Sequence, residues 1–243
     1  MPQAGKGSGA QDGALNCLQA ERERKVRRMR KMRKIIFATG NAGKMKEIRM
    51  ILDGLAIDGM PVEILSMKEA GLDISIVEDG KSFTENAVIK AQAVAEAAKK
   101  AGEAAIVLAD DSGLEIDYLN KEPGIYSARY LGEETSYHEK NGNLLERLSG
   151  VPDEERTARF VCAIACVFPD GETLTELATV EGRIGYEEKG ENGFGYDPIF
   201  IVPEYGRSTA ELTEEEKNKI SHRGKALRAM KERLAVGREM ESV

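Results

Sequence analysis

The chain of 243 residues is poor in the side chains that build disulfide frameworks and zinc sites. It has no tryptophan and three cysteines, Cys17, Cys162 and Cys166, which are too few for a disulfide framework and fit a reducing cytoplasm. Its two histidines, His138 and His222, lie far apart in the sequence, which argues against a zinc site. We therefore expect a cytoplasmic protein without structural disulfides or zinc.

Long apolar runs are also missing. No segment is long and apolar enough to span a bilayer, and the basic start is not followed by the apolar region of a secretory signal. The net charge of −7 is divided unequally, because residues 1–34 carry +7 and the remainder carries −14. So acidic a body is a poor match for nucleic acid and suits small anions bound at focused basic points or through a metal. We expect neither a nucleic-acid nor a membrane partner.

The composition changes near residue 34. Residues 1–33 combine a Gly- and Ala-rich start with a basic run, and we interpret them as a disordered basic N-terminal extension. The alternative is an arm that binds nucleic acid or membrane. Residues 34–243 are long enough for one sizeable α/β domain, or for two small lobes that share a cleft.

Hydrophobic periodicity predicts the elements of this body. Cys162 and Cys166 should face the same side of one buried strand. The order of elements predicts a mixed sheet with helices on its faces. The expected strands are 35–39, 62–66, 105–109, 158–168, 173–184 and 198–202, with residues 114–119 as an optional continuation of strand after residues 110–113. The expected helices are 44–52, 83–101, 136–150 and 214–234, the last broken near Ser221.

The first candidate site follows the first strand, where glycines and a lysine open a helix. Backbone N–H groups at a helix start attract anions, and glycine lets a phosphate approach closely. The spacing is not that of a Walker A loop, and a plain tight turn with a surface lysine is equally compatible. The residues are Thr39, Gly40, Asn41, Ala42, Gly43 and Lys44.

The second candidate site follows the strand 105–109. Asp110 and Asp111 precede Ser112 and Gly113, and such strand ends open onto the ligand crevice of α/β sheets. Carboxylates suit Mg²⁺, and one of them can accept a proton from an attacking water. The alternative is a turn with solvated acids.

Further candidates lie on the long helix and its approach. Ser82 and Glu85 form a capping-box pattern, so the acid has a structural explanation. Asn86 and Lys90 share one helix face. Lys90 is the only charge in an apolar stretch, and it either reaches a phosphate or extends toward solvent.

An aromatic loop and a basic segment complete the set. Phe194 lies between Gly193 and Gly195, an arrangement that exposes a ring for base stacking, unless the ring packs into the core. Lys217 is a candidate for phosphate charge, and Arg223 offers a rigid fork of donors for a base carbonyl. His222 offers the same contact or caps a helix.

Together these segments resemble the inosine triphosphate pyrophosphatases, also called non-canonical purine NTP pyrophosphatases or XTP/dITP diphosphohydrolases. The resemblance implies an elongated mixed α/β fold with two lobes around a cleft, a homodimer, and Mg²⁺-dependent hydrolysis of ITP, dITP and XTP to the monophosphate and pyrophosphate, which cleanses the nucleotide pool. The similar segments are IFATGNAGK, SFTENAVIKA, LADDSGLEID, PGIYSARY, FGYDPIF and AELTEEEKNKISHRGKAL.

The resemblance also implies a role for each matched residue. Glu78 and Asp111 would bind the metal, and Asp111 would also be the general base, supported by Asp110. Phe194 would stack on the purine. Thr39 to Lys44, Lys90 and Lys217 would hold phosphates, Ser112 would contact the substrate, Gly195, Tyr196 and Asp197 would shape the base pocket, and His222 and Arg223 would contact the base edge. The rivals are a Maf-type pyrophosphatase for other nucleotides and a non-catalytic nucleotide sensor.

Overall fold

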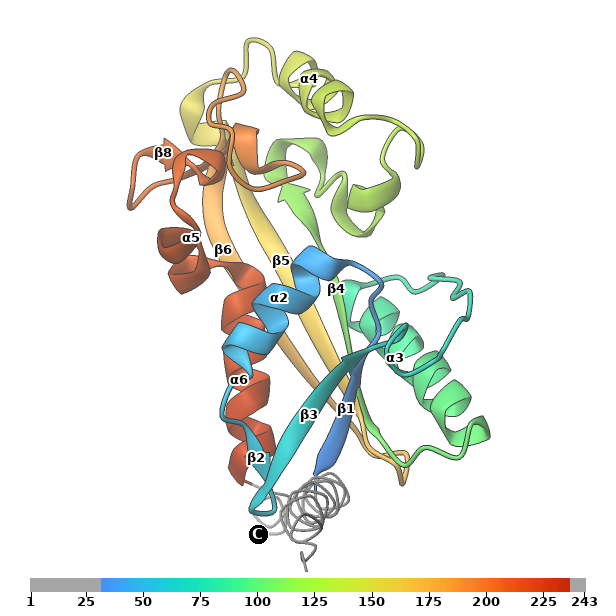
Figure 1. Cartoon of the computed structure of the whole chain (residues 1–243). Coiled ribbons are helices and arrows are strands. Elements are labelled where there is room, and N and C mark those ends of the chain that lie inside the picture. Colours follow the sequence, from blue (N-terminus) through green and yellow to red (C-terminus); the bar gives the residue numbers. More distant parts are fainter. Residues whose placement is uncertain (1–31, 237–243) are drawn as a thin grey trace, which may run out of the picture.

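The computed structural model describes residues 32–236, which form an elongated α/β body (Figure 1). Three long strands run through both halves of this body and connect them. The predicted basic extension lies outside the described residues as far as residue 31, and so does Cys17. The first strand begins at Arg33, two residues before the expected start at residue 35.

One eight-stranded sheet forms the body, in the order β2-β3-β1-β4-β5-β6-β7-β8. β1 is parallel to β3 and β4, and all the other neighbours are antiparallel. The predicted mixed sheet is therefore confirmed. The strands are β1 (Arg33–Phe37), β2 (Ala56–Ile57), β3 (Met60–Ser66), β4 (Ile106–Ile116), β5 (Thr157–Val167), β6 (Thr173–Ile184), β7 (Phe200–Val202) and β8 (Arg207–Ser208).

Helices cover both faces of the sheet (Figure 1). Among the described residues none of them is both long and apolar enough to cross a membrane. The α-helices are α2 (Ala42–Ile51), α3 (Phe83–Lys100), α4 (Tyr137–Arg147), α5 (Glu214–Ile220) and α6 (His222–Val236). The 3-10 turns are η1 (Asp117–Leu119), η2 (Gly124–Arg129), η3 (Asp153–Glu155), η4 (Asp197–Ile199) and η5 (Thr209–Glu211).

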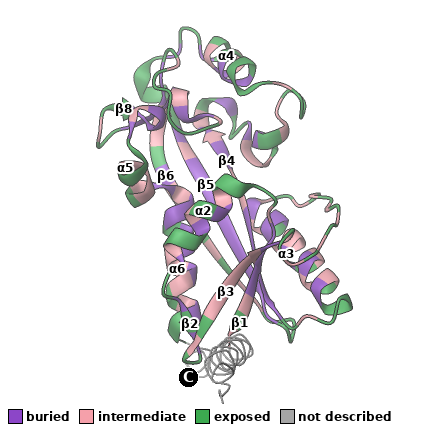
Figure 2. Cartoon of the chain, viewed as in Figure 1, coloured by how far each residue is buried: buried purple, intermediate pink, exposed green. Residues whose placement is uncertain are grey.

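Alternation along the strands divides the core between the two faces, because successive strand residues point to opposite sides. One face packs on α2 and α6 and includes Cys162 and Cys166, which confirms that both thiols are buried on the same side. The other face packs on α3. A third cluster fills the half that holds α4, around the far ends of the long strands. Figure 2 shows the buried strands between partly exposed helices.

Most predicted elements are confirmed, and the difference that matters for function is β4. Asp110 to Gly113 were expected to follow a strand that ends at residue 109, but they lie inside one continuous strand of 11 residues. The cause is distant in sequence, since β5 pairs along β4 from Val107 to Ile116. β1 accompanies β4 only as far as Leu108, so the polar part of β4 is uncovered on that edge.

Two helix starts also differ in detail. The helix expected at 44–52 begins at Ala42, so Ala42, Gly43 and Lys44 form its first turn. Ser82 caps α3 as expected, by accepting from the backbone N–H of Glu85 at 3.1 Å. The reciprocal bond of the predicted capping box is shifted, because Glu85 accepts from the N–H of Lys81 instead of Ser82. The break at Ser221 between α5 and α6 is confirmed.

The largest fully buried side chain belongs to Arg156, which follows η3. Its guanidinium donates to the carbonyls of Leu148 and Ile184 at 2.7 and 2.8 Å and also to that of Gly185. Tyr186 covers the group at 4.3 Å. One side chain therefore ties the end of α4 to the end of β6.

We expect Arg156→Met to lower the free energy of unfolding by about 3 kcal/mol or more, because three buried carbonyls lose their donor. Urea unfolding measures the change. Arg183→Met is the matched control, since its ion pair with Asp153 is exposed and should be worth under about 1 kcal/mol. Equal stability of the two variants would contradict this assignment for Arg156.

Candidate active site

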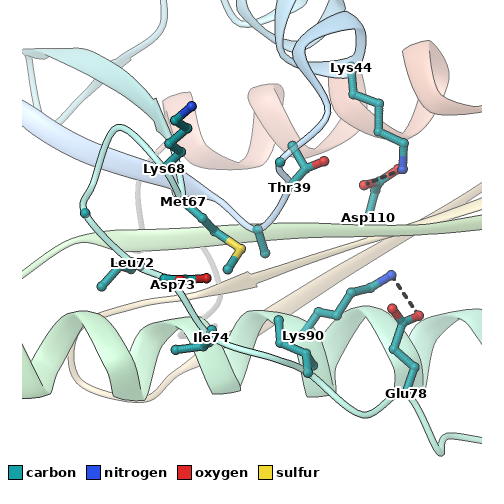
Figure 3. A pocket seen from close by; sticks show the side chains of 14 residues that line it. Thr39, Lys44, Met67, Lys68, Leu72, Asp73, Ile74, Glu78, Lys90 and Asp110 are labelled. Atoms are coloured by element: carbon teal, nitrogen blue, oxygen red, sulfur yellow. Dashed lines mark hydrogen bonds and ion pairs between the residues drawn. The ribbon is translucent and has the colours of Figure 1, made fainter.

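A cavity of about 830 Å³ opens beside the uncovered edge of β4. It lies between the β1–α2 connection, the segment 67–78 that follows β3, and one side of α3 (Figure 3). Both charged and apolar side chains line it. Its polar lining includes Thr39, Lys44, Lys68, Asp73, Glu78, Lys90 and Asp110.

Asp110 and Asp111 point to opposite faces of the sheet, because they are neighbours on one strand. Asp110 meets side chains from α2 and α6, and Asp111 meets side chains from α3. Figure 3 shows the Lys44–Asp110 pair on one side of β4 and the Lys90–Glu78 pair on the other. Adjacency in sequence therefore gives the two acids different surroundings.

Asp110 is held between two cations. Its Oδ2 lies 3.0 Å from Nζ of Lys44 and 3.1 Å from Nε of Arg223, and the hydroxyl of Ser112 is 3.4 Å away. Burial alone would raise the pKa of Asp110, but the charges of Lys44 and Arg223 hold it well below its usual range. Glu47 of α2 accepts a second bond from Arg223, at 3.0 Å from Nη1. Asp110 is therefore a permanently ionised anchor.

Asp111 is held more loosely. Asn86 donates to its Oδ2 at 3.2 Å, and Nζ of Lys90 lies 3.3 Å from its Oδ1. Burial raises the pKa of Asp111 above its usual value, against the lowering effect of the Lys90 charge. A carboxylate in this state is a better proton acceptor than an ordinary one.

Glu78 completes this side of the cluster. Its Oε2 lies 3.0 Å from Nζ of Lys90, so the carboxylates of Glu78 and Asp111 converge on a single positive group. Burial would lower the pKa of Lys90, but Asp111, Asp110 and Glu78 raise it. Between residues 32 and 236 no group of three or more His, Cys, Asp or Glu side chains is placed to hold a metal. Two carboxylates fit an ion that keeps other oxygen ligands, as Mg²⁺ does.

The start of α2 faces the same cavity. Asn41 caps the helix by accepting from the N–H of Lys44 at 3.0 Å, and Thr39 accepts from the N–H of Asn41 at 3.2 Å. The space beside Gly40 is open, since a Cβ added to this residue would meet no atom within 4 Å. The N-terminus of α2 and the Lys44 ammonium therefore form a positive border along the cavity.

Arg223 connects this cluster to the aromatic loop. Its guanidinium carbon lies 5.9 Å from the ring centroid of Phe194. The Phe194 side chain is 62% exposed, so the alternative of a ring packed into the core is wrong. One residue therefore touches the buried carboxylate of Asp110 and borders an open aromatic ring.

The aromatic loop, residues 193–197, is fixed from inside by Asp197. This carboxylate accepts from the N–H of Phe194 at 2.8 Å and lies 2.5 Å from Nζ of Lys217. Gly193 has a φ of +81°, and a Cβ there would lie 2.3 Å from the Asp197 carboxylate, so only glycine fits. The structure thus places Lys217 at this loop, 5.1 Å from the Phe194 ring centroid.

Two further candidates have their contacts outside the aromatic loop. Tyr196 is buried, and its hydroxyl donates to the carbonyl of Ser127 at 2.7 Å. His222 stacks on Phe160 with ring centroids 5.0 Å apart. Burial, with the nearby charges of Arg223 and Lys217, lowers the pKa of His222 well below its usual value, so the ring stays neutral.

Three residues that contact the site were not predicted as site residues from the sequence. Asn86 was noticed only for sharing a helix face with Lys90, and both indeed reach Asp111. Glu47 follows Lys44 by one helical turn, a spacing that is the only local signal of its contact with Arg223. Arg129 donates to the Glu78 carbonyl at 3.4 Å from 51 residues away, which no local pattern predicts.

Comparison with known proteins shows relatives that match most of the chain. The chain is 48% identical over 203 residues to a dITP/XTP pyrophosphatase of Clostridium perfringens, covering 83% of this chain and 97% of the relative. It is 47% identical over 206 residues to the dITP/XTP pyrophosphatase of Bacillus subtilis, covering 85% and 99%. The solved HAM1 protein of Coxiella burnetii is similar with a TM-score of 0.75 and 39% identity, covering 85% of this chain and all of that one.

Residues 35–233 match the Ham1 family, and this span contains every candidate residue placed above. With relatives that it covers almost end to end at nearly half identity, the chain belongs to the Ham1 family.

Proposed function

We propose that this chain hydrolyses non-canonical purine nucleoside triphosphates, ITP, dITP and XTP, to the monophosphate and pyrophosphate, and so removes them from the nucleotide pool. The observation that carries the proposal is Arg223, which joins an anion-binding cluster to an open aromatic ring. A nucleoside triphosphate would use the cluster for its phosphates and the ring for its base. The relatives named as dITP/XTP pyrophosphatases support the choice of purine.

At the base end, the Phe194 ring stacks on the purine, a contact worth roughly 1–3 kcal/mol. Asp110 and Glu47 occupy Nε and Nη1 of Arg223 and leave Nη2 without a hydrogen-bond partner among residues 32–236. This donor suits the 6-oxo group of hypoxanthine or xanthine. The 6-amino group of adenine would oppose one donor with another, which leaves buried groups unpaired.

At the phosphate end, the N-terminus of α2 and the ammonium groups of Lys44 and Lys90 offset the charge of the triphosphate. Asp111 accepts a proton from water, whose oxygen bonds to the α-phosphorus. The bond from that phosphorus to the bridging oxygen breaks, and pyrophosphate leaves with the electron pair. No covalent intermediate is required. Lys217 pairs with Asp197, so a phosphate that it binds would lie beside the aromatic loop.

Glu78 and Asp111 would hold Mg²⁺ together with phosphate oxygens. When bound, the ion supplies charge neutralisation at the phosphates and polarises their oxygens. The homodimer remains a prediction from the resemblance, and the cytoplasmic location remains a prediction from the cysteine content. The absence of a nucleic-acid partner is likewise a prediction, which salt-dependent DNA binding of the full chain and of a chain lacking residues 1–33 would test.

We expect Asp111→Asn to lower kcat by about 10²–10⁴-fold, the usual contribution of a general base, while the melting temperature stays close to that of the wild type. Steady-state pyrophosphate release from ITP and thermal unfolding measure the two effects. Asp117→Asn is the matched control, because Asp117 pairs with Arg159 outside the cavity. Wild-type rates in the Asp111 variant would remove this residue from catalysis.

We expect pyrophosphate release from ITP, dITP and XTP to exceed that from ATP by at least about 10²-fold in kcat/KM, because the pocket's donor rejects an amino group. Release should stop when Mg²⁺ is chelated. Preference for dUTP or TTP would favour the Maf-type alternative. Binding of nucleotides without any turnover would favour the sensor.

The neutral His222 predicts a pH dependence of stability. The folded ring binds no proton near neutral pH, but the unfolded ring takes one up below about pH 6.5. Stability therefore falls as pH falls, by up to about 1.4 kcal/mol per pH unit relative to a chain without this ring. His222→Gln should show the shallower loss in urea unfolding, and parallel curves would contradict a neutral His222 ring in the folded protein.

A further inference from the structure

A polar cluster lies behind the aromatic loop, on the side of α4. Asn141 of α4 donates through Nδ2 to Oε1 of Glu188 at 2.6 Å and to the carbonyl of Gly195 at 3.3 Å. His138, one turn earlier on α4, has its Nδ1 2.6 Å from the other oxygen of Glu188. We call His138, Asn141 and Glu188 the loop clamp, since Glu188 joins the other two side chains and Asn141 contacts the carbonyl of Gly195, the residue after Phe194.

Asn141 is 1% exposed and its orientation is determined by its partners. The reverse orientation of the amide would direct Oδ1 at the Glu188 carboxylate and the Gly195 carbonyl, which are both acceptors. As oriented, Oδ1 is buried without a hydrogen-bond partner among the described residues. Such a group costs stability, and native proteins carry few of them. Because the unpartnered Oδ1 makes Asn141 costly for stability, its side chain suits a role in positioning the loop.

The contacts of α4 with the loop extend beyond this amide. The Tyr137 ring meets the Tyr196 ring edge to face, with centroids 5.3 Å apart. A Cβ on Gly195, whose φ is +71°, would lie 3.5 Å from the Tyr137 ring. Both residues that follow Phe194 therefore rest on α4. Asp197 holds the N–H of Phe194 from the opposite side.

We propose that Asn141, held in place by Glu188, is a positioning residue for the purine-stacking ring of Phe194. Its bond to the Gly195 carbonyl limits rotation of the peptide between Gly195 and Tyr196, one residue after Phe194, so the ring is presented to the base before the nucleotide arrives. Binding then does not have to order this loop. The inference rests on the proposed function, because it assigns the ring to the purine.

Steady-state kinetics with ITP test this role. We expect Asn141→Ala to raise KM by about tenfold, the value of roughly one well-made hydrogen bond, with little change in kcat. Asn143→Ala is the matched control, since Asn143 lies on the same helix but accepts from the Tyr130 hydroxyl at 2.7 Å. Its KM should equal that of the wild type. A KM unchanged in the Asn141 variant overturns the proposal.

A double-mutant cycle separates this inference from the proposed function. Phe194→Ala should itself raise KM, and Asn141→Ala added to it should then have no further effect, because no ring is left to position. If the effects of the two substitutions on KM are fully additive, the positioning role of Asn141 is overturned, while the assignment of the Phe194 ring to the purine stands. If Phe194→Ala leaves KM unchanged, the assignment of the ring to the purine fails first, and the clamp fails with it.

The lack of tryptophan in the chain provides a readout that does not depend on activity. Phe194→Trp introduces a single tryptophan on the aromatic loop, which can be excited selectively over the tyrosines. Asn141→Ala in that background should lower its steady-state anisotropy, and Asn143→Ala should not; equal anisotropy overturns the proposal. If Asn141→Ala does not fold, Glu188→Gln serves in its place, because it removes the charge that orients the amide and keeps the shape of the side chain.

Discussion

The carboxylate of Asp110, buried between Lys44 and Arg223, is the interaction on which the rest of the site depends. A buried charge is tolerated only with close partners, and removing one partner leaves an uncompensated charge in the interior. Because the two cations come from α2 and α6, the carboxylate of β4 determines where both helices lie. Arg223 then carries this constraint to the aromatic loop, so the proposed phosphate end and the proposed base end are placed by a single anchor.

Strand alternation separates the tasks of the two neighbouring acids. Asp110 faces α2 and α6, has two full charges beside it and holds the architecture. Asp111 faces α3, where an amide and one ammonium leave it a raised pKa and room to exchange partners. A pair of carboxylates with such different pKa values is a common way to obtain a fixed anion and a proton acceptor from the same residue type.

Much of this could be predicted from the sequence, because the signals are local. Period-two and helical patterns indicate the long strands, the Ala-rich α3 and the break at Ser221, and glycines on both sides of Phe194 indicate an exposed ring. The position of Asp110 to Gly113 inside a strand could not be predicted from local signals, because polar residues and glycine there are typical of turns, whereas pairing with residues 157–167 keeps the strand extended. The contacts of Arg129 with Glu78, and of Lys217 with Asp197, likewise join residues distant in sequence.

The alternation along β4 has a consequence for how the protein can vary. An insertion or deletion of one residue before Asp110 would exchange the faces of the two acids, presenting Asp111 to α6 and Asp110 to α3. No compensating side chain could repair both errors at once. Length changes are therefore tolerable in the connections at the rim of the sheet, whereas this strand can accept only substitutions.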